Sequence, residues 1–182
     1  MPRVTPISGK DQVPEESRHV ADDVMSVFGR IRGPFSMLLY SPKLAERMLG
    51  IVKFNRDGCI VEDRLRSHAI LAAVRERESA YVWSAQVGAA RRAGVGEATI
   101  DLLRTKGDAS GLPDDERDIV NLTRQLVRIN RCDYPIFNRL HAKYGTQWMV
   151  ELIAIAHYFL VLSGVTNAFE VPVPPDGDQL PS

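Results

Sequence analysis

The sequence predicts an all-α protein built as one helical bundle. Apolar residues recur three and four positions apart almost throughout the 182-residue chain, which is the spacing of a helix with one buried face. The segments between these runs are short, and none alternates apolar with polar residues as a half-buried strand would. Short connections favour antiparallel neighbours, so we expect consecutive helices to pack side by side around a single core.

Three helices are expected in the first part of the chain. The run 14–30 begins with a proline and two acidic residues, which suits a first helical turn. The run 41–54 has Ser41 as its N-cap and Pro42 at its first helical position. The run 61–76 carries leucine and alanine residues along one side, so this helix should pack closely against its neighbours.

Five further helices are expected at 79–94, 96–105, 112–130, 133–145 and 146–169. Gly94 is a suitable residue to end the first of them. The third carries acidic residues in its first turn, where they are favourable to the helix dipole. The last contains the most apolar stretch of the chain, 149–165, which is too short to span a bilayer and is interrupted by Glu151 and His157. It is expected to be a buried core helix.

Composition divides the chain into three parts and excludes some functions. Residues 1–13 are polar with two prolines and are expected to form a flexible arm, residues 14–171 form the helical domain, and the proline-rich residues 172–182 form a tail that cannot continue a helix. Lys plus Arg and Asp plus Glu both number 23, so no basic field for nucleic acid is expected. Basic pairs such as Arg91 and Arg92 are expected on solvated helix faces.

The cysteines and histidines give no metal site. Cys59 and Cys132 are isolated from each other in the sequence, so neither a disulfide framework nor a metal site is expected. No His, Asp, Glu and Cys grouping has metal-ligand spacing, and no phosphate-binding glycine loop is present, so no cofactor is expected. Few cysteines and no signal peptide fit a cytoplasmic protein without a membrane anchor.

Three blocks of the chain carry a family resemblance. They are 64–104, with Tyr81 and Trp83 followed by the hairpin RAGVGEATIDLLR, then 111–145, and then 148–175, which ends in NAFEVPVPP. In order and spacing these blocks resemble the carboxymuconolactone decarboxylase and alkylhydroperoxidase D-like superfamily. The resemblance covers roughly residues 41–175. It implies a helical domain of the alkylhydroperoxidase D-like type.

The reactive positions of the peroxidase branch are replaced in this chain. That branch has an essential Glu, a Cys-x-x-Cys pair and a His, and these positions fall at Ser67, Ser79, Val82 and Gln86. A dithiol peroxidase needs a thiolate and a second thiol to resolve it, so this activity is not expected. In the decarboxylase-like branch the aromatic residues Tyr81 and Trp83 match, while the Glu and His of that pattern are again Val82 and Gln86.

The resemblance also places a pocket between two helices. Positions 79, 82 and 86 share one stripe, and a second stripe lies on the preceding helix. If the two faces meet as in the relatives, the pocket-lining residues are Ser67, Ile70, Leu71, Val74, Ser79, Val82, Trp83 and Gln86. Their neutral side chains favour an apolar or neutral ligand. The alternative is that the family's cavity is filled and serves as core.

His157 is the first candidate for catalysis and Tyr81 the second. An imidazole could act as acid or base near neutral pH, and a phenol could donate a hydrogen bond to a developing oxyanion. His157 could equally be a core histidine, and Tyr81 a packing residue. His68 is expected to face a neighbouring helix or subunit.

Three functions remain open from the sequence. The first is a cofactor-independent lyase, decarboxylase or isomerase that acts on a small oxo- or lactone-type molecule. The second is a non-catalytic ligand-binding or oligomeric member of the superfamily, and the third, disfavoured, is a thiol peroxidase. The resemblance implies a homo-oligomer, as dimer, trimer or hexamer, and no nucleic acid or membrane partner is expected.

Overall fold

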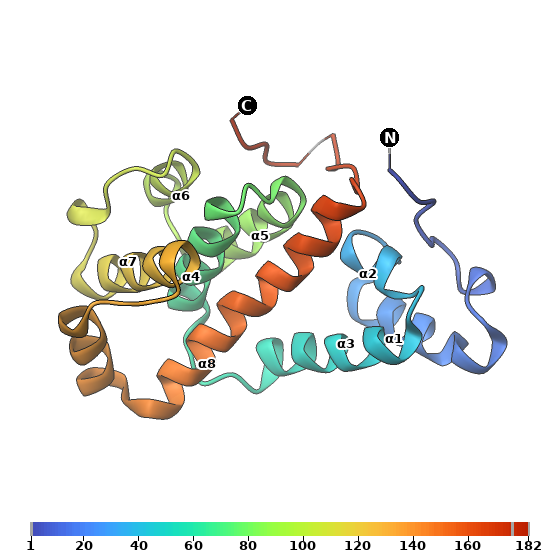
Figure 1. Ribbon diagram of the computed structural model, residues 1–182, viewed down its shortest axis with the longest axis horizontal. Helices are drawn as coiled ribbons and strands as arrows, with labels where there is room; N and C mark the ends of the chain where they lie inside the picture. The colour runs from blue at the N-terminus through green and yellow to red at the C-terminus, as the bar shows by residue number, and fades with distance from the viewer. Residues whose placement is uncertain (1, 176, 182) are drawn as a thin grey trace.

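The structure is a computed structural model that describes residues 2–175 and 177–181, and every regular element in that range is a helix (Figure 1). The α-helices are α1 (Arg18–Phe28), α2 (Pro34–Leu38), α3 (Pro42–Asp57), α4 (Asp63–Glu76), α5 (Ala80–Arg92), α6 (Glu97–Arg104), α7 (Asp114–Ile129) and α8 (Tyr134–Ala168). Short 3₁₀ turns lie at Lys10–Gln12, Glu15–Ser17 and Ala109–Gly111. No strand occurs among these residues, so the all-α prediction is confirmed.

Helix α8 runs diagonally through the molecule and separates it into two sides (Figure 1). Helices α4 to α7 lie on one side, where α4 packs against α5, α7 and α8. Helices α1 to α3 lie on the other, where α2 packs against α3 and α8. Ten of the 14 residues of α4 are buried, and three of them are alanines, which allow neighbouring helices to approach closely.

The apolar core follows this arrangement. One cluster contains residues of α1 to α7 and of the C-terminal half of α8, and a second joins α4 and α7 to the middle part of α8. Tyr158 of α8 reaches the opposite side, where its hydroxyl donates a hydrogen bond of 3.0 Å to the carbonyl oxygen of Met48 in α3. The phenol therefore satisfies its polar group while its ring is buried.

Helix α8 has a break where the sequence predicted a boundary between 133–145 and 146–169. Gly145 has φ 80° and ψ 175°, which is not helical, and the helical residues on either side continue from it. Glycine tolerates this positive φ without strain. By length and composition α8 could cross a membrane, but 56% of its most apolar stretch is buried in the protein. A core helix passes the same test, so these properties carry no conclusion about a membrane.

Two features differ from the sequence-based expectation. Helix α2 was not predicted, because five residues are too few to show a helical period. The N-terminal arm, expected to be flexible, packs on the domain instead. Ile7 and Val13 are almost fully buried in the core, and the amide of Ile7 donates a hydrogen bond to the carbonyl oxygen of Ser36. Burial of these two side chains offsets the entropy lost by ordering the arm.

Candidate functional site

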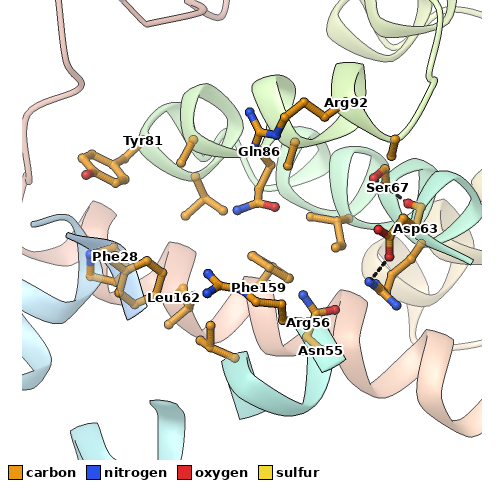
Figure 2. Close-up of a pocket in the computed structure, with 18 of the residues that line it drawn as sticks. Phe28, Asn55, Arg56, Asp63, Ser67, Tyr81, Gln86, Arg92, Phe159 and Leu162 are labelled. Atoms are coloured by element: carbon orange, nitrogen blue, oxygen red, sulfur yellow. Dashed lines mark hydrogen bonds and ion pairs between the residues drawn. The ribbon is translucent and has the colours of Figure 1, made fainter. Parts of the chain in front are cut away.

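A cavity of about 460 Å³ lies between the two sides of the molecule (Figure 2). Helices α4 and α5 form one wall, and residues of α1 to α3 with their connections form the other. Phe159 and Leu162 of α8 contribute to its apolar lining, together with Phe28, Phe35 and Ile70. The cavity is large enough for a small organic molecule, and most of the named wall residues would contact carbon atoms.

Helix α5 presents one continuous stripe to this cavity. Its members are Tyr81, Val82, Ala85, Gln86 and Ala89, whose spacing of one, three and four residues follows the helical period. The two alanines leave space where larger side chains would fill the gap between α5 and α3. Gln86 projects its amide into the cavity from this wall (Figure 2).

Five of the predicted site residues line the cavity. They are Ser67, Ile70, Tyr81, Val82 and Gln86. The faces of α4 and α5 therefore meet as expected for these five residues, which surround one cavity. The remaining members of the set lie outside the cavity-lining residues.

Leu71, Val74, Ser79 and Trp83 are fully buried but contribute to packing instead of the cavity wall. Leu71 and Val74 belong to the main apolar core. Ser79 precedes the first residue of α5 as its N-cap, so the helical spacing used in the prediction does not apply to it. Trp83 lies about 200° around α5 from Tyr81 and has the guanidinium of Arg104 5.9 Å from its ring centre.

Four arginines also line the cavity, so the predicted neutral lining is wrong. Arg66 is held by the carboxylate of Asp63 and the carbonyl oxygen of Val61. Arg32, Arg56 and Arg92 are the other three.

Arg56 and Arg92 lie on opposite walls of the cavity. Arg56, from α3, approaches the space below Gln86 in Figure 2, and Arg92, from α5, lies above it. Among the described residues neither has an ion pair with a carboxylate, and Arg56 makes only long contacts of 3.4 Å to the carbonyl oxygen of Val27. That these two residues line one cavity could not be predicted from the sequence, because they lie 36 positions apart on helices with ordinary charged faces.

Neutral polar groups complete the wall. The hydroxyl of Ser67 donates to the carbonyl oxygen of Asp63 at 2.7 Å, so it is already engaged within α4. The side-chain oxygen of Asn55 is buried without a hydrogen-bond partner among the described residues. A buried acceptor without a donor is costly, so a ligand hydroxyl or a water molecule beside Asn55 would be stabilising.

Tyr81 is the titratable group best placed for chemistry. Its side chain is 7% exposed, and burial raises the pKa of its phenol, with the positive charges of Arg32 and Arg30 opposing this shift. The hydroxyl therefore stays protonated at neutral pH and can donate a hydrogen bond. Gly33 leaves room for the ring, because a Cβ at this position would lie 2.4 Å from a carbon of the Tyr81 ring, and glycine also tolerates the φ of +60° found there.

His157 lies on α8 outside the set of cavity-lining residues. Its ring is half-buried, and its Nδ1 is 2.8 Å from the carbonyl oxygen of Ile153 one turn earlier. This is the arrangement expected of a structural histidine.

His68, expected to face a neighbouring helix, does so. Its Nε2 lies 3.0 Å from a carboxylate oxygen of Glu116 in α7, and Arg64 pairs with the other oxygen of that carboxylate.

The cysteines stay apart from the cavity. Cys59 and Cys132 are free thiols in loops, and burial raises the pKa of Cys132, which disfavours its thiolate. Among residues 2–175 and 177–181 no group of three or more His, Cys, Asp or Glu side chains could hold a metal ion.

No protein-family model and no curated protein matches the chain. What the cavity can bind therefore follows from its own groups: guanidinium ions on two walls, one buried phenol, side-chain amides and apolar surfaces.

Proposed function

We propose that this protein is a carboxymuconolactone decarboxylase-like enzyme that binds a small organic acid in the cavity and acts on an oxo or lactone group without a cofactor. The sequence resemblance supports the family. The observation that supports an acid as the ligand is the pair Arg56 and Arg92, two solvent-exposed residues that line one cavity from opposite walls without a carboxylate partner among the described residues.

A carboxylate is the group these arginines favour. The guanidinium fork donates two parallel hydrogen bonds to a carboxylate, and such charge-assisted bonds are stronger than neutral ones. The apolar lining would bury the carbon skeleton of the same molecule. One end of the ligand would thus be fixed by charge and the rest by shape.

Tyr81 would stabilise the negative charge that develops on oxygen during the reaction. Decarboxylation of a 3-oxo acid breaks the bond to the departing carboxylate carbon, and the electron pair moves onto the ketone oxygen as an enolate. Isomerisation through an enolate places charge on the same oxygen. A protonated phenol already in position would stabilise that charge, while water returns the proton to carbon. The carboxylate held by the arginines would be a second, non-reacting one, because a clamp on the leaving group would oppose its loss as neutral carbon dioxide.

Binding without turnover is the second candidate. The titratable groups that line the cavity favour this candidate. Besides the arginines they are Tyr81 and Asp63, and the Asp63 carboxylate is already paired with Arg66. Such a lining offers no free general base for proton abstraction. Thiol peroxidase activity is the third candidate, and Ser79, Val82 and the two distant cysteines give it no support.

The assembly is also a proposal. We infer a homo-oligomer, as the resemblance implies, and a cytoplasmic location, and a helix-to-helix contact between copies would cover the exposed Val150 and Val161 of α8. Light scattering of the purified protein should give a mass of two, three or six chains. A monomer at micromolar concentration would contradict this proposal.

The test of the site uses two small aromatic acids. Calorimetry with 4-isopropylbenzoate measures binding of one carboxylate on an apolar body, and carbon dioxide release from 3-(4-carboxyphenyl)-3-oxopropanoate, corrected for the spontaneous rate, measures turnover. We expect Arg56→Gln and Arg92→Gln each to raise Kd about tenfold or more, because each removes a charge-assisted hydrogen bond. Arg47→Gln, an exposed arginine also on α3, is the matched control and should leave Kd unchanged.

Tyr81→Phe separates catalysis from binding. It should keep the Kd for 4-isopropylbenzoate and lower the rate of carbon dioxide release at least tenfold. Tight binding with no release above background would select the binding-only function. Absence of binding, or equal weakening by Arg47→Gln and Arg56→Gln, would reject the proposed site.

A further inference from the structure

A second hollow of about 170 Å³ adjoins the main cavity at Tyr81. Arg32, Tyr81 and Ala85 line both spaces, so the two spaces meet at these residues. The remaining lining of the small hollow comes from Ser84 of α5 and from Pro174 and Gly177 of the C-terminal tail. The tail therefore supplies one wall of a compartment that continues the main cavity.

Specific contacts hold the tail in this position. The carboxylate of Asp178 accepts two hydrogen bonds from Arg91, at 2.7 and 3.0 Å, and a longer one from Arg104 at 3.5 Å. Leu180 packs on the main apolar core.

The approach of the tail to α5 is close. A Cβ added at Gly177 would lie 2.0 Å from the Ser84 hydroxyl oxygen, so only glycine fits there without movement. The tail is thus an anchored wall despite its lack of helix.

The polar groups of the small hollow are chiefly donors. The guanidinium of Arg32 can only donate, and the Ser84 hydroxyl can also donate, while the single phenol proton of Tyr81 is assigned to the reacting oxygen in the main cavity. Carbonyl and carboxylate oxygens are the complementary groups. Pro174, with no amide hydrogen, adds an apolar surface beside them.

We propose that this compartment, bounded by Arg32, Tyr81, Ser84 and the tail residues Pro174 and Gly177, is a subsite for a hydrogen-bond acceptor at the far end of the bound acid. The tail is then a specificity determinant, and Asp178 is a positioning residue that acts by holding it. The inference rests on the proposed function, because it assumes that an organic acid occupies the main cavity. It adds that ligands with a distal carbonyl are preferred over apolar ones of the same size.

The test compares two probes of equal heavy-atom count. These are 4-(3-oxobutyl)benzoate, which carries a distal ketone, and 4-(3-methylbutyl)benzoate, in which a methyl-bearing carbon replaces the carbonyl. Calorimetry with the full chain gives the Kd ratio, which is the Kd of 4-(3-methylbutyl)benzoate divided by the Kd of 4-(3-oxobutyl)benzoate. We expect the ketone to bind about tenfold more tightly to the unaltered protein, the effect of one satisfied hydrogen bond to a charged or well-placed donor.

Two variants and one control test which groups cause the preference for the ketone probe. Ser84→Ala removes a donor of the compartment, and Asp178→Asn weakens the attachment of the tail. Each should lower the Kd ratio towards one while the Kd of 4-(3-methylbutyl)benzoate stays unchanged. Glu97→Gln is the matched control, because Glu97 also pairs with Arg91 but lies outside the tail and the compartment. It should keep the ratio of the unaltered protein.

The outcomes separate this inference from the function beneath it. A ratio near one in the unaltered protein, with both probes bound, overturns the subsite and leaves the proposed acid site standing. If Ser84→Ala keeps the Kd ratio of the unaltered protein, the subsite is likewise overturned. If Asp178→Asn keeps that ratio, the role of the tail is overturned. If neither probe binds, both the proposed function and this inference are rejected.

Discussion

The two sides of α8 differ in how they are packed. On the α4–α7 side, α4 is buried along most of its length, and buried carboxylates such as Glu116 and Asp118 are paired with arginines or histidine. On the α1–α3 side, α3 buries only three of its 16 residues. Its Leu44 and Phe54 are 49% and 41% exposed.

The difference teaches where stability is concentrated and where the cavity lies. Stability is concentrated where helices exclude water, which is around α4. The cavity lies where this dense side meets the sparse one, so its walls combine a well-fixed surface on α4 and α5 with a less buried surface on α3. Arg56 and Arg92 belong to these two different surfaces.

The largest expected effect is on the dense side. Leu71→Ala should lower the free energy of unfolding by about 2–5 kcal/mol, because it removes a fully buried side chain and leaves a cavity. The same substitution on the sparse side, Leu44→Ala, should cost about 0.5 kcal/mol or less. Urea unfolding followed by circular dichroism measures both, and equal losses would remove the contrast between the two sides.

A smaller effect is expected at the buried carboxylate between α4 and α7. Glu116→Gln weakens the contacts to His68 and Arg64, and should cost about 1.5–3 kcal/mol, the range for hydrogen bonds to charged groups. Asp114→Asn on the same helix is the control, because its carboxylate is 86% exposed and its ion pair and helix-dipole contribution together should be worth about 1 kcal/mol or less. If the two variants unfold at the same urea concentration, the buried pairing does not stabilise the dense side.

The smallest effect concerns the tail, which is attached to α5 and α6 by Asp178. The hydrogen bond from Arg91 lowers the pKa of this carboxyl below its ordinary value of about 3.9. A lowered folded-state pKa means that the attachment is fully present above the unfolded value and is lost as pH falls through the folded one. A carbon-detected NMR titration should place the Asp178 midpoint below about 3.9. Arg91→Gln should move that midpoint upward, and an unchanged midpoint would show that Arg91 does not hold the tail.

Much of the fold follows from local patterns. Three features depend only on residues close together in sequence. They are the helical period, the proline at the first position of the helices that begin at Pro34 and Pro42, and the break at Gly145. Of these, Pro42 and the end of the helix before Gly145 could be predicted, while the helix beginning at Pro34 was too short to be recognised.

The lining of the cavity could be predicted in part for the same reason. Ser67 and Ile70 share a stripe on α4, and Val82 and Gln86 share one on α5, so local spacing could place them together. Leu71 shows the limit of that reasoning. It follows Ile70 directly in the sequence, yet its side chain lies in the core and not at the cavity. Which positions face the cavity depends on the angle between α4 and α5, and the spacing within one helix does not show that angle.

By itself, the sequence determined that this protein is helical, approximately where its helices begin and end, and that Cys-x-x-Cys chemistry is missing from α5. The tertiary structure alone decided the charge of the cavity and the place of the tail. Arg56, Arg92 and Asp178 belong to segments that meet only after folding, and their residue types are ordinary on a solvated surface. Periodicity reports which face of one helix is apolar, whereas a binding site depends on which distant faces are brought opposite each other.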